Sequence, residues 1–203
     1  MLIASLTFHE AAHAWAADKL GDPTARHLGR LSLNPAVHID PIGTLVFPLL
    51  AAVTGAPLIG WAKPVPVDFR HLRSPQRDFA LIAAAGPASN LLLAIGATIV
   101  IGLLPHSAPG DLVGRSLLTT PREFLLALIQ INVLLAVFNM LPVPPLDGGN
   151  VLIGLLPSGA GRAIARLRPY GFLILYALML TGALAAIARP VQSIVYGLLS
   201  LLI

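Results

Sequence analysis

The sequence predicts an all-α protein that crosses a membrane several times. Hydrophobic residues make up 56% of the 203 residues and charged residues only 11%, and the mean hydropathy is +0.82. A water-soluble domain carries about 25% charged residues to cover its surface. Apolar runs of the length that spans a bilayer as a helix recur along the chain. Lipid is therefore the predicted solvent of most of this chain.

The composition also excludes two other kinds of site. The chain has no Cys, so thiolate metal sites are excluded and any metal ligand must be His, Asp or Glu. A net charge of +4 would suit nucleic acid, but the basic residues lie in loops between apolar runs, as membrane proteins place them. We therefore expect the lipid bilayer, and no nucleic acid, as a partner.

Charge-poor runs set the expected elements, which are residues 1–17, 41–62, 79–110, 124–146, 169–188 and 190–203. The gaps between these runs are too short for a separate soluble domain. We expect a single domain over 1–203, with a core of about 1–157 and C-terminal helices at about 169–203. The first run lacks the basic n-region and cleavage site of a signal peptide. We interpret it as a retained membrane helix.

The run over 41–62 is unlike the others, because it is interrupted by Pro41, Gly43, Pro48, Gly55, Pro57 and Gly60. The distribution of the 13 basic residues indicates whether this run spans the membrane or returns to the side it left. If 41–62 returns to the side it left, ten basic residues lie on one side and three on the other, namely Arg115, Arg122 and Arg189. If it spans, the division is six to seven. The positive-inside rule favours a re-entrant element, with loops 19–40 and 61–78 both cytoplasmic.

The stretch "AKPVPVDF" at 62–69 alternates Pro with Val. Pro is confined to edge strands because it cannot donate to a ladder. We expect an edge strand here, which would offer a docking edge to another extended chain.

The first run carries His9, Glu10 and His13, an H-E-x-x-H pattern, at its centre. Positions i and i+4 share one helix face, so both imidazoles reach one metal ion, and the Glu between them is placed to take a proton from an attacking water. The pattern also arises by chance, but a charged group in the bilayer costs about 2.5–3.5 kcal/mol, which favours function here. Zinc suits these ligands best, although ligand type alone leaves other divalent metals open.

A catalytic zinc usually has three protein ligands and an open position. The acidic residues at apolar runs are Glu123, Asp40 and Asp147. Prolines break the helix just before Asp147, which places its carboxylate near the cytoplasmic end of its run, at the depth predicted for His13. Asp147 is the favoured third ligand, and a plain turn residue before Gly-Gly is the alternative.

Other polar residues fit two interpretations. Asn90 and Asn139 lie in apolar runs, where each amide either bonds a neighbouring helix or contacts a substrate. The remaining histidines lie in loops and are interpreted as interfacial or structural; they are His27, His38, His71 and His106.

Four stretches together carry a resemblance: "HEAAHAWAADKLGDPTARHLGRLSLNPAVHIDPIGT", "GWAKPVPVDFR", "AGPASN" and "FNMLPVPPLDGG". In this combination the chain resembles the site-2 protease family of intramembrane zinc metalloproteases, in particular its short bacterial branch. The likeness covers nearly the whole chain. Nothing in the sequence resembles a PDZ or CBS regulatory domain.

The resemblance implies a three-helix catalytic core. The first helix would carry the H-E-x-x-H pattern with Glu10 as the catalytic residue, and the second would carry the G-P-x-x-N pattern that ends at Asn90. The third would lead from Asn139 to Asp147, the third ligand of one Zn²⁺ per chain. Asn90 and Asn139 would lie near the cleft and bind the substrate backbone or the oxyanion.

The implied activity is hydrolysis of peptide bonds within or near the transmembrane segments of protein substrates, in a bacterial cytoplasmic membrane with the site towards the cytoplasm. The alternative is a catalytically silent zinc-binding membrane scaffold, or a metal carrier. Glu10 counts against both, because neither needs a general base, and a carrier would need further ligand clusters. Composition excludes a soluble aminopeptidase. The sequence specifies neither the substrate nor the oligomeric state.

Overall fold

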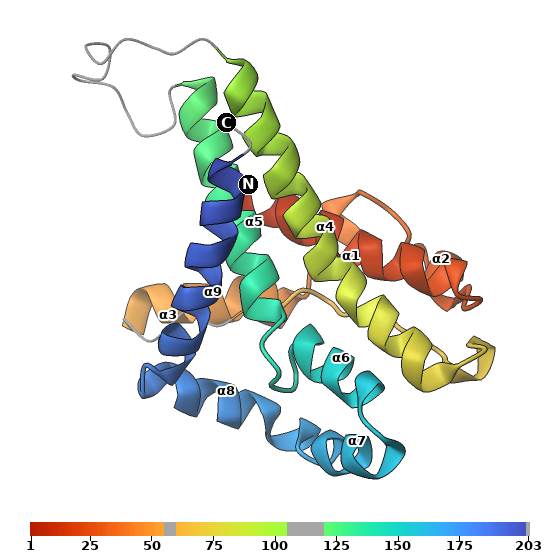
Figure 1. Cartoon of the computed structure of the whole chain (residues 1–203). Helices are drawn as coiled ribbons and strands as arrows, with labels where there is room; N and C mark the ends of the chain where they lie inside the picture. Colours follow the sequence, from red (N-terminus) through yellow and green to blue (C-terminus); the bar gives the residue numbers. More distant parts are fainter. Residues whose placement is uncertain (55–59, 105–119, 202–203) are drawn as a thin grey trace.

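The computed structural model describes residues 1–54, 60–104 and 120–201 (Figure 1). Within these ranges the chain is helical and no residue lies in a β-strand, so the predicted all-α fold is confirmed. The helices are α1 (Leu2–Lys19), α2 (Thr24–His27), η1 (Pro35–Val37), η2 (Pro41–Val46), α3 (Phe47–Thr54), η3 (Phe69–His71), α4 (Pro75–Leu103), α5 (Pro121–Asn139), α6 (Asp147–Leu155), α7 (Ser158–Ala165), η4 (Arg168–Tyr170), α8 (Gly171–Leu180) and α9 (Ala183–Ser200).

The long helix α4 is the element against which α1, α5 and α6 all pack (Figure 1). It begins at Pro75, whose missing N–H is not needed at a first helical position. The Asp78 carboxylate accepts the Ser74 backbone N–H at 2.8 Å and satisfies the helix start. α5 begins with a capping box formed by Thr120 and Glu123. Both helix starts are therefore encoded locally.

Small side chains let the helices approach closely. Ala94 and Ala97 of α4 are buried against Ile129 and Val133 of α5, and a second cluster joins Ala16 and Ala17 of α1 to Ile82 of α4. Without a hydrophobic driving force between helices in lipid, such packing carries much of the association. The three-helix core of α1, α4 and α5 follows from it.

Among the described residues, four helices are long and apolar enough to cross a membrane, over Pro75–Leu103, Pro121–Asn139, Gly159–Leu180 and Ala183–Ser200. Large apolar side chains point outward from them; Leu92 and Leu103 of α4, for example, are 69% and 80% exposed. Such surfaces suit lipid rather than water. The chain is an integral membrane protein. α1 falls outside this set, because Glu10, Asp18 and Lys19 make it more polar, and its place in the membrane stays a prediction.

The run over 41–62 does not form one helix. Asp40 caps the π-helical turn η2 through the Ile42 and Gly43 N–H groups, and η2 leads into α3. The chain then returns, since the Trp61 N–H donates to the Gly43 carbonyl at 3.2 Å and the Trp61 carbonyl accepts the Thr44 hydroxyl at 2.9 Å. Both ends of this segment therefore meet at one place, as a re-entrant element requires.

The edge strand expected at 62–69 is wrong as a description of this chain. Residues 60–68 form no helix and belong to no ladder, and the described residues contain no strand to pair with them. Pro64 and Pro66 also lack the N–H groups that a ladder would need on one side of this segment, so only its other side could pair with a strand. Gly55, Pro57, His106 and Arg115 of the sequence analysis lie outside the described residues.

Two expected helix boundaries differ. The run over 124–146 ends as a helix at Asn139, because the prolines that follow cannot continue it. The break expected near Arg189 lies instead at Gly182, which adopts φ +73° and joins α8 to α9. Pro190 is accommodated inside α9.

A buried carboxylate ties the loop after α1 to the start of α4. Asp22 is fully buried and accepts the backbone N–H groups of Thr24 at 3.0 Å and Asp68 at 2.7 Å, together with the Thr24 hydroxyl and His71 Nδ1. Burial opposes ionisation of Asp22, but the hydrogen bonds outweigh it and lower the pKa of this carboxyl below 3.8.

We expect Asp22→Ala to lower the free energy of unfolding by about 2–3 kcal/mol, because the part-buried N–H groups of Thr24 and Asp68 lose their acceptor. Since the pKa is lowered in the folded state, the stabilisation is complete above pH 3.8 and is lost as the pH falls further. Urea unfolding in mixed micelles measures both effects. The gap between wild type and variant should narrow on acidification, and a gap independent of pH would contradict this role.

Candidate metal centre

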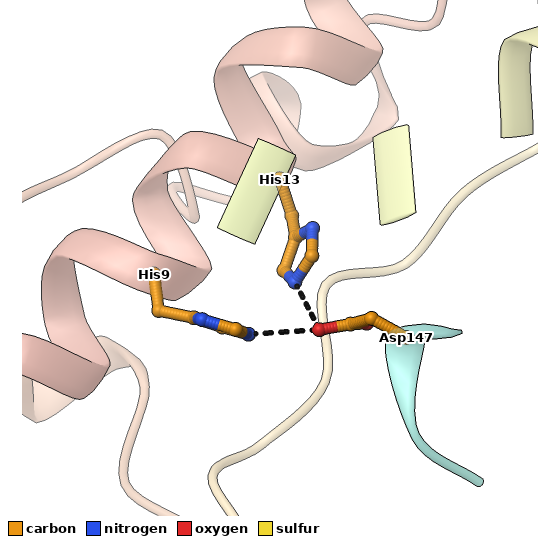
Figure 2. Close-up of side chains that lie close together, drawn as sticks. All are labelled: His9, His13 and Asp147. Carbon is orange, nitrogen blue, oxygen red and sulfur yellow. Dashed lines mark hydrogen bonds and ion pairs between the residues drawn. The ribbon is translucent and has the colours of Figure 1, made fainter. Parts of the chain in front are cut away.

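Two histidines of α1 and the first residue of α6 meet at one point, although 134 residues separate His13 from Asp147 in the chain. Asp147 Oδ2 lies 3.0 Å from His9 Nε2 and 3.4 Å from His13 Nε2, and Figure 2 shows both imidazoles turned towards this carboxylate. One atom from each of the three side chains lies within 4.8 Å of the others. The structure thus brings together the three residues that the sequence analysis selected.

The chain around Asp147 is shaped by two glycines. A Cβ at residue 148 would collide with the backbone of Met140 and Leu141, and a Cβ at residue 149 would lie 2.7 Å from the Pro144 backbone nitrogen. The proline-rich turn therefore folds directly over the start of α6. This packing is why the "LDGG" stretch needs both glycines.

α6 is held to α4 at its other end. The Gln76 amide donates to the carbonyls of Ile153 at 3.0 Å and Leu156 at 2.7 Å, which are among the orphan carbonyls at the end of α6. Gly154 packs against Ala80 so closely that a Cβ at residue 154 would clash. These contacts fix the position of α6, and with it Asp147, relative to α4.

The outer nitrogen of each imidazole has its own partner on α4. His13 Nδ1 lies 2.7 Å from the Ile82 backbone carbonyl, and His9 Nδ1 lies 2.6 Å from Asn90 Oδ1. A backbone carbonyl only accepts, so His13 Nδ1 carries a proton, and in the neutral imidazole Nε2 then keeps its lone pair on the side that faces Asp147. Metal-binding histidines in proteins are held in this way.

One stripe of α4 serves both histidines. Ile82, Gly86 and Asn90 recur at four-residue spacing on one helix face. Between the two partners lies Gly86, where a Cβ would stand 2.5 Å from His13 Cε1 and 2.6 Å from His9 Nε2. Only a glycine leaves room for the two rings there. Gly86 belongs to the "AGPASN" stretch that carried the family resemblance, but the sequence did not explain why a glycine is needed there.

The two imidazoles and the Asp147 carboxylate lie so close together that a positive charge among them is needed. His9 and His13 are buried, and the Asp147 side chain is only 16% exposed. Two neutral imidazoles that turn their Nε2 lone pairs towards a carboxylate at 3.0–3.4 Å are repelled by it, unless a positive charge, either a proton on a ring nitrogen or a metal ion, lies among them. Ligands of one tetrahedral zinc, at 2.0–2.1 Å from the metal, are about 3.3 Å apart. The residues present therefore fit zinc in number, type and spacing.

Glu10 lies beside this group and is uncommitted. Its side chain is half-buried and makes no hydrogen bond or ion pair within the described ranges. A carboxylate next to a metal centre and without a partner is available to accept a proton.

The two asparagines of the sequence analysis lie differently. Asn90 is 0% exposed and its amide contacts His9, Ser5 and Asn132, so it bridges helices, and the expected substrate-binding role does not fit this placement. Asn139 is half-buried and donates to the Leu135 carbonyl of its own helix. Its substrate role stays a prediction.

The other acidic candidates are used elsewhere. Asp40 caps η2 and Glu123 belongs to the capping box of α5. Sequence reasoning missed Ser5 and Asn132, which are 1% and 0% exposed and bonded to the Asn90 amide or to each other. Polar residues at helical spacing from the H-E-x-x-H pattern were the available signal for Ser5.

The chain is similar to known proteins both at the level of a family and in sequence. The model of "Peptidase family M50" matches residues 106–182, which include Asn139 and Asp147. YwhC of Bacillus subtilis is 40% identical over 181 residues, covering 89% of this chain and 78% of the relative. Rip2 of Mycolicibacterium smegmatis is 33% identical over 181 residues, covering 89% and 65%. Rip2 of Mycobacterium tuberculosis (strain H37Rv) is 32% identical over 183 residues, covering 90% and 66%.

All three relatives carry the name "putative zinc metalloprotease". The chain spans about two thirds of the length of the two Rip2 relatives. No solved structure matches the chain.

We expect Gly86→Ala to weaken zinc binding by about 10–100-fold, because the new methyl group would occupy the space of both imidazoles. Gly96→Ala in the same helix is the matched control, since a Cβ there meets nothing within 4 Å. Zinc content after purification and competition with a chelator measure the difference. Equal zinc affinities of the two variants would show that the rings do not bind metal in this arrangement.

Proposed function

The chain belongs to peptidase family M50, the site-2 protease family, and on that premise we propose that it is a zinc-dependent endopeptidase that cuts peptide bonds within the membrane. The observation that carries the proposal is the meeting of two imidazoles and a carboxylate beside the uncommitted Glu10. These groups belong to an integral membrane protein, so the bond they act on is expected at membrane depth as well.

His9, His13 and Asp147 would hold one zinc per chain and leave a fourth position open. When bound, zinc would supply Lewis acidity. This lowers the pKa of the attacking water, so that it can lose a proton near neutral pH, and polarises the carbonyl that is attacked. Glu10 takes the proton from the attacking water and passes it to the leaving amine.

Substrate binding draws on residues that remain uncommitted. The Asn139 amide uses one contact to Leu135 and has a second N–H to offer to a carbonyl oxygen of the substrate. Asn90 has no such capacity, because its donors and acceptor are already bonded. We therefore keep the oxyanion role for Asn139 alone.

The proposed substrate is a single transmembrane segment of another protein. A helix hides its carbonyls, so the segment must unwind near the site before it can be cut. Residues 62–67 lie directly after the re-entrant element, form no helix and have no partner strand within the described ranges. They offer an edge to which an unwound chain can be added.

The proposed location is a bacterial cytoplasmic membrane with the site towards the cytoplasm. The return of the chain from Trp61 to Gly43 supports the arrangement in which ten of the 13 basic residues lie on one side. By the positive-inside rule that side is cytoplasmic. The relatives named above are bacterial proteins.

We expect Glu10→Gln to reduce cleavage by about 10²–10⁴-fold while zinc stays bound, because the amide removes the proton acceptor and none of the ligands. The assay is cleavage of a panel of single-span reporters by the purified chain in proteoliposomes, with zinc content measured on each variant. Asp18→Asn is the control, since it makes the same change in α1 away from the metal centre.

Zinc-loaded wild type that cuts nothing in the panel, together with an equally inactive variant, would favour a zinc-binding scaffold. Full activity of Glu10→Gln would contradict the proton-transfer role directly.

We expect the double substitution Pro64→Ala, Pro66→Ala to reduce cleavage several-fold without loss of zinc. Both prolines restrict the backbone of this segment, and alanine gives it more conformational freedom, so that the conformation that pairs with a substrate strand is less populated. The same reporter panel measures the effect. Unchanged cleavage of a range of substrates would exclude docking along this edge.

A further inference from the structure

Three polar side chains are buried behind the metal centre, one on each helix of the core. Ser5 of α1, Asn90 of α4 and Asn132 of α5 are 1%, 0% and 0% exposed. A buried amide or hydroxyl is costly unless its donors and acceptors are paired. Their hydrogen bonds can be followed atom by atom, and they lead to His9.

The chain of bonds begins at a backbone carbonyl. The Asn132 amide nitrogen lies 2.8 Å from the Leu128 carbonyl and 3.0 Å from Ser5 Oγ. The carbonyl of Leu128 only accepts, so the NH₂ group of Asn132, and not its oxygen, must face it. Asn132 Oδ1 is thereby turned towards Asn90.

The second amide is oriented by two acceptors. Asn90 Nδ2 lies 2.8 Å from Asn132 Oδ1 and 3.2 Å from the Ser5 backbone carbonyl. Neither of these oxygens has a proton to give, so Asn90 must present its NH₂ group to them. Its remaining oxygen, Oδ1, then faces His9 Nδ1 at 2.6 Å.

This series of hydrogen bonds fixes which nitrogen of His9 carries a proton. Because Asn90 Oδ1 only accepts, His9 Nδ1 must carry a proton, and in the neutral imidazole Nε2 is then left with its lone pair. Nε2 is the atom that faces Asp147 and the metal centre. The orientation of both amides, which is ambiguous in an isolated asparagine, is settled here by two backbone carbonyls.

We infer that Ser5 and Asn132 are positioning residues of the metal centre: through Asn90 they set the tautomer and ring orientation of His9 without touching the metal. The inference rests on the zinc-binding part of the proposed function and is independent of proteolysis. Partners bonded directly to a metal-binding histidine, as Asn90 is to His9, typically change metal affinity by about 10–100-fold when they are lost, and Asn132 acts through that partner. The same bonds join α1, α4 and α5, so the packing of the core and the ligand geometry are coupled.

The test compares Asn132→Leu with Thr98→Val in the purified full chain. Both remove a buried polar group near the α4–α5 contact, but within the described part of the chain the Thr98 hydroxyl bonds only the Ala94 carbonyl of its own helix. Competition with a chromophoric chelator gives the zinc dissociation constant. We expect a loss of about 10–100-fold for Asn132→Leu and less than about twofold for Thr98→Val. Equal affinities, with both variants folded by circular dichroism, would overturn the inference.

Two further measurements cover the case in which Asn132→Leu does not fold. Ser5→Ala removes one of the two acceptors of the Asn132 amide and should weaken zinc binding several-fold in the same direction. Nitrogen NMR of ¹⁵N-histidine-labelled wild type should show a proton on His9 Nδ1 with or without zinc. A His9 ring that carries no proton on Nδ1 would overturn the inference, even if zinc binding or cleavage failed for another reason.

Discussion

The close approach of α4 to α1 at Gly86 is the contact on which the rest of this structure depends. Because residue 86 has no side chain, the two imidazoles lie against the α4 backbone, and a Cβ there would be 2.6 Å from His9 Nε2. Four residues on either side, the Ile82 carbonyl and the Asn90 amide then hold the outer nitrogens of His13 and His9. One face of one helix thus leaves both inner nitrogens to the metal centre.

α4 also positions the two other helices next to the site, α6 and α5. Its first turns bond the end of α6, so the helix that begins with Asp147 is positioned by the same element that positions the histidines. Its later turns pack against α5 through small residues. In lipid, where burial of apolar surface gives no gain between helices, this close packing and the buried amide bonds take over the role of a hydrophobic core.

Much of this arrangement could be predicted from the sequence. The H-E-x-x-H spacing predicts the shared face of His9 and His13, and the prolines before Asp147 predict a carboxylate that leaves its helix at the same depth. The bond partner of Asn90 could not be predicted, because the sequence does not show which helices flank it. The strand at 62–69 was wrong because a strand needs a partner, and alternation of Pro and Val says nothing about one.

The central claim is that one zinc is bound by two imidazoles and one carboxylate of this chain. Zinc K-edge X-ray absorption on the purified protein, with the metal content determined on the same sample, tests it most directly. We predict one zinc per chain, with nitrogen and oxygen neighbours at about 2.0–2.1 Å and the multiple-scattering pattern of two imidazoles. The signal should fall to one imidazole in His13→Ala. No bound zinc, or an imidazole signal that His13→Ala leaves unchanged, would contradict the account.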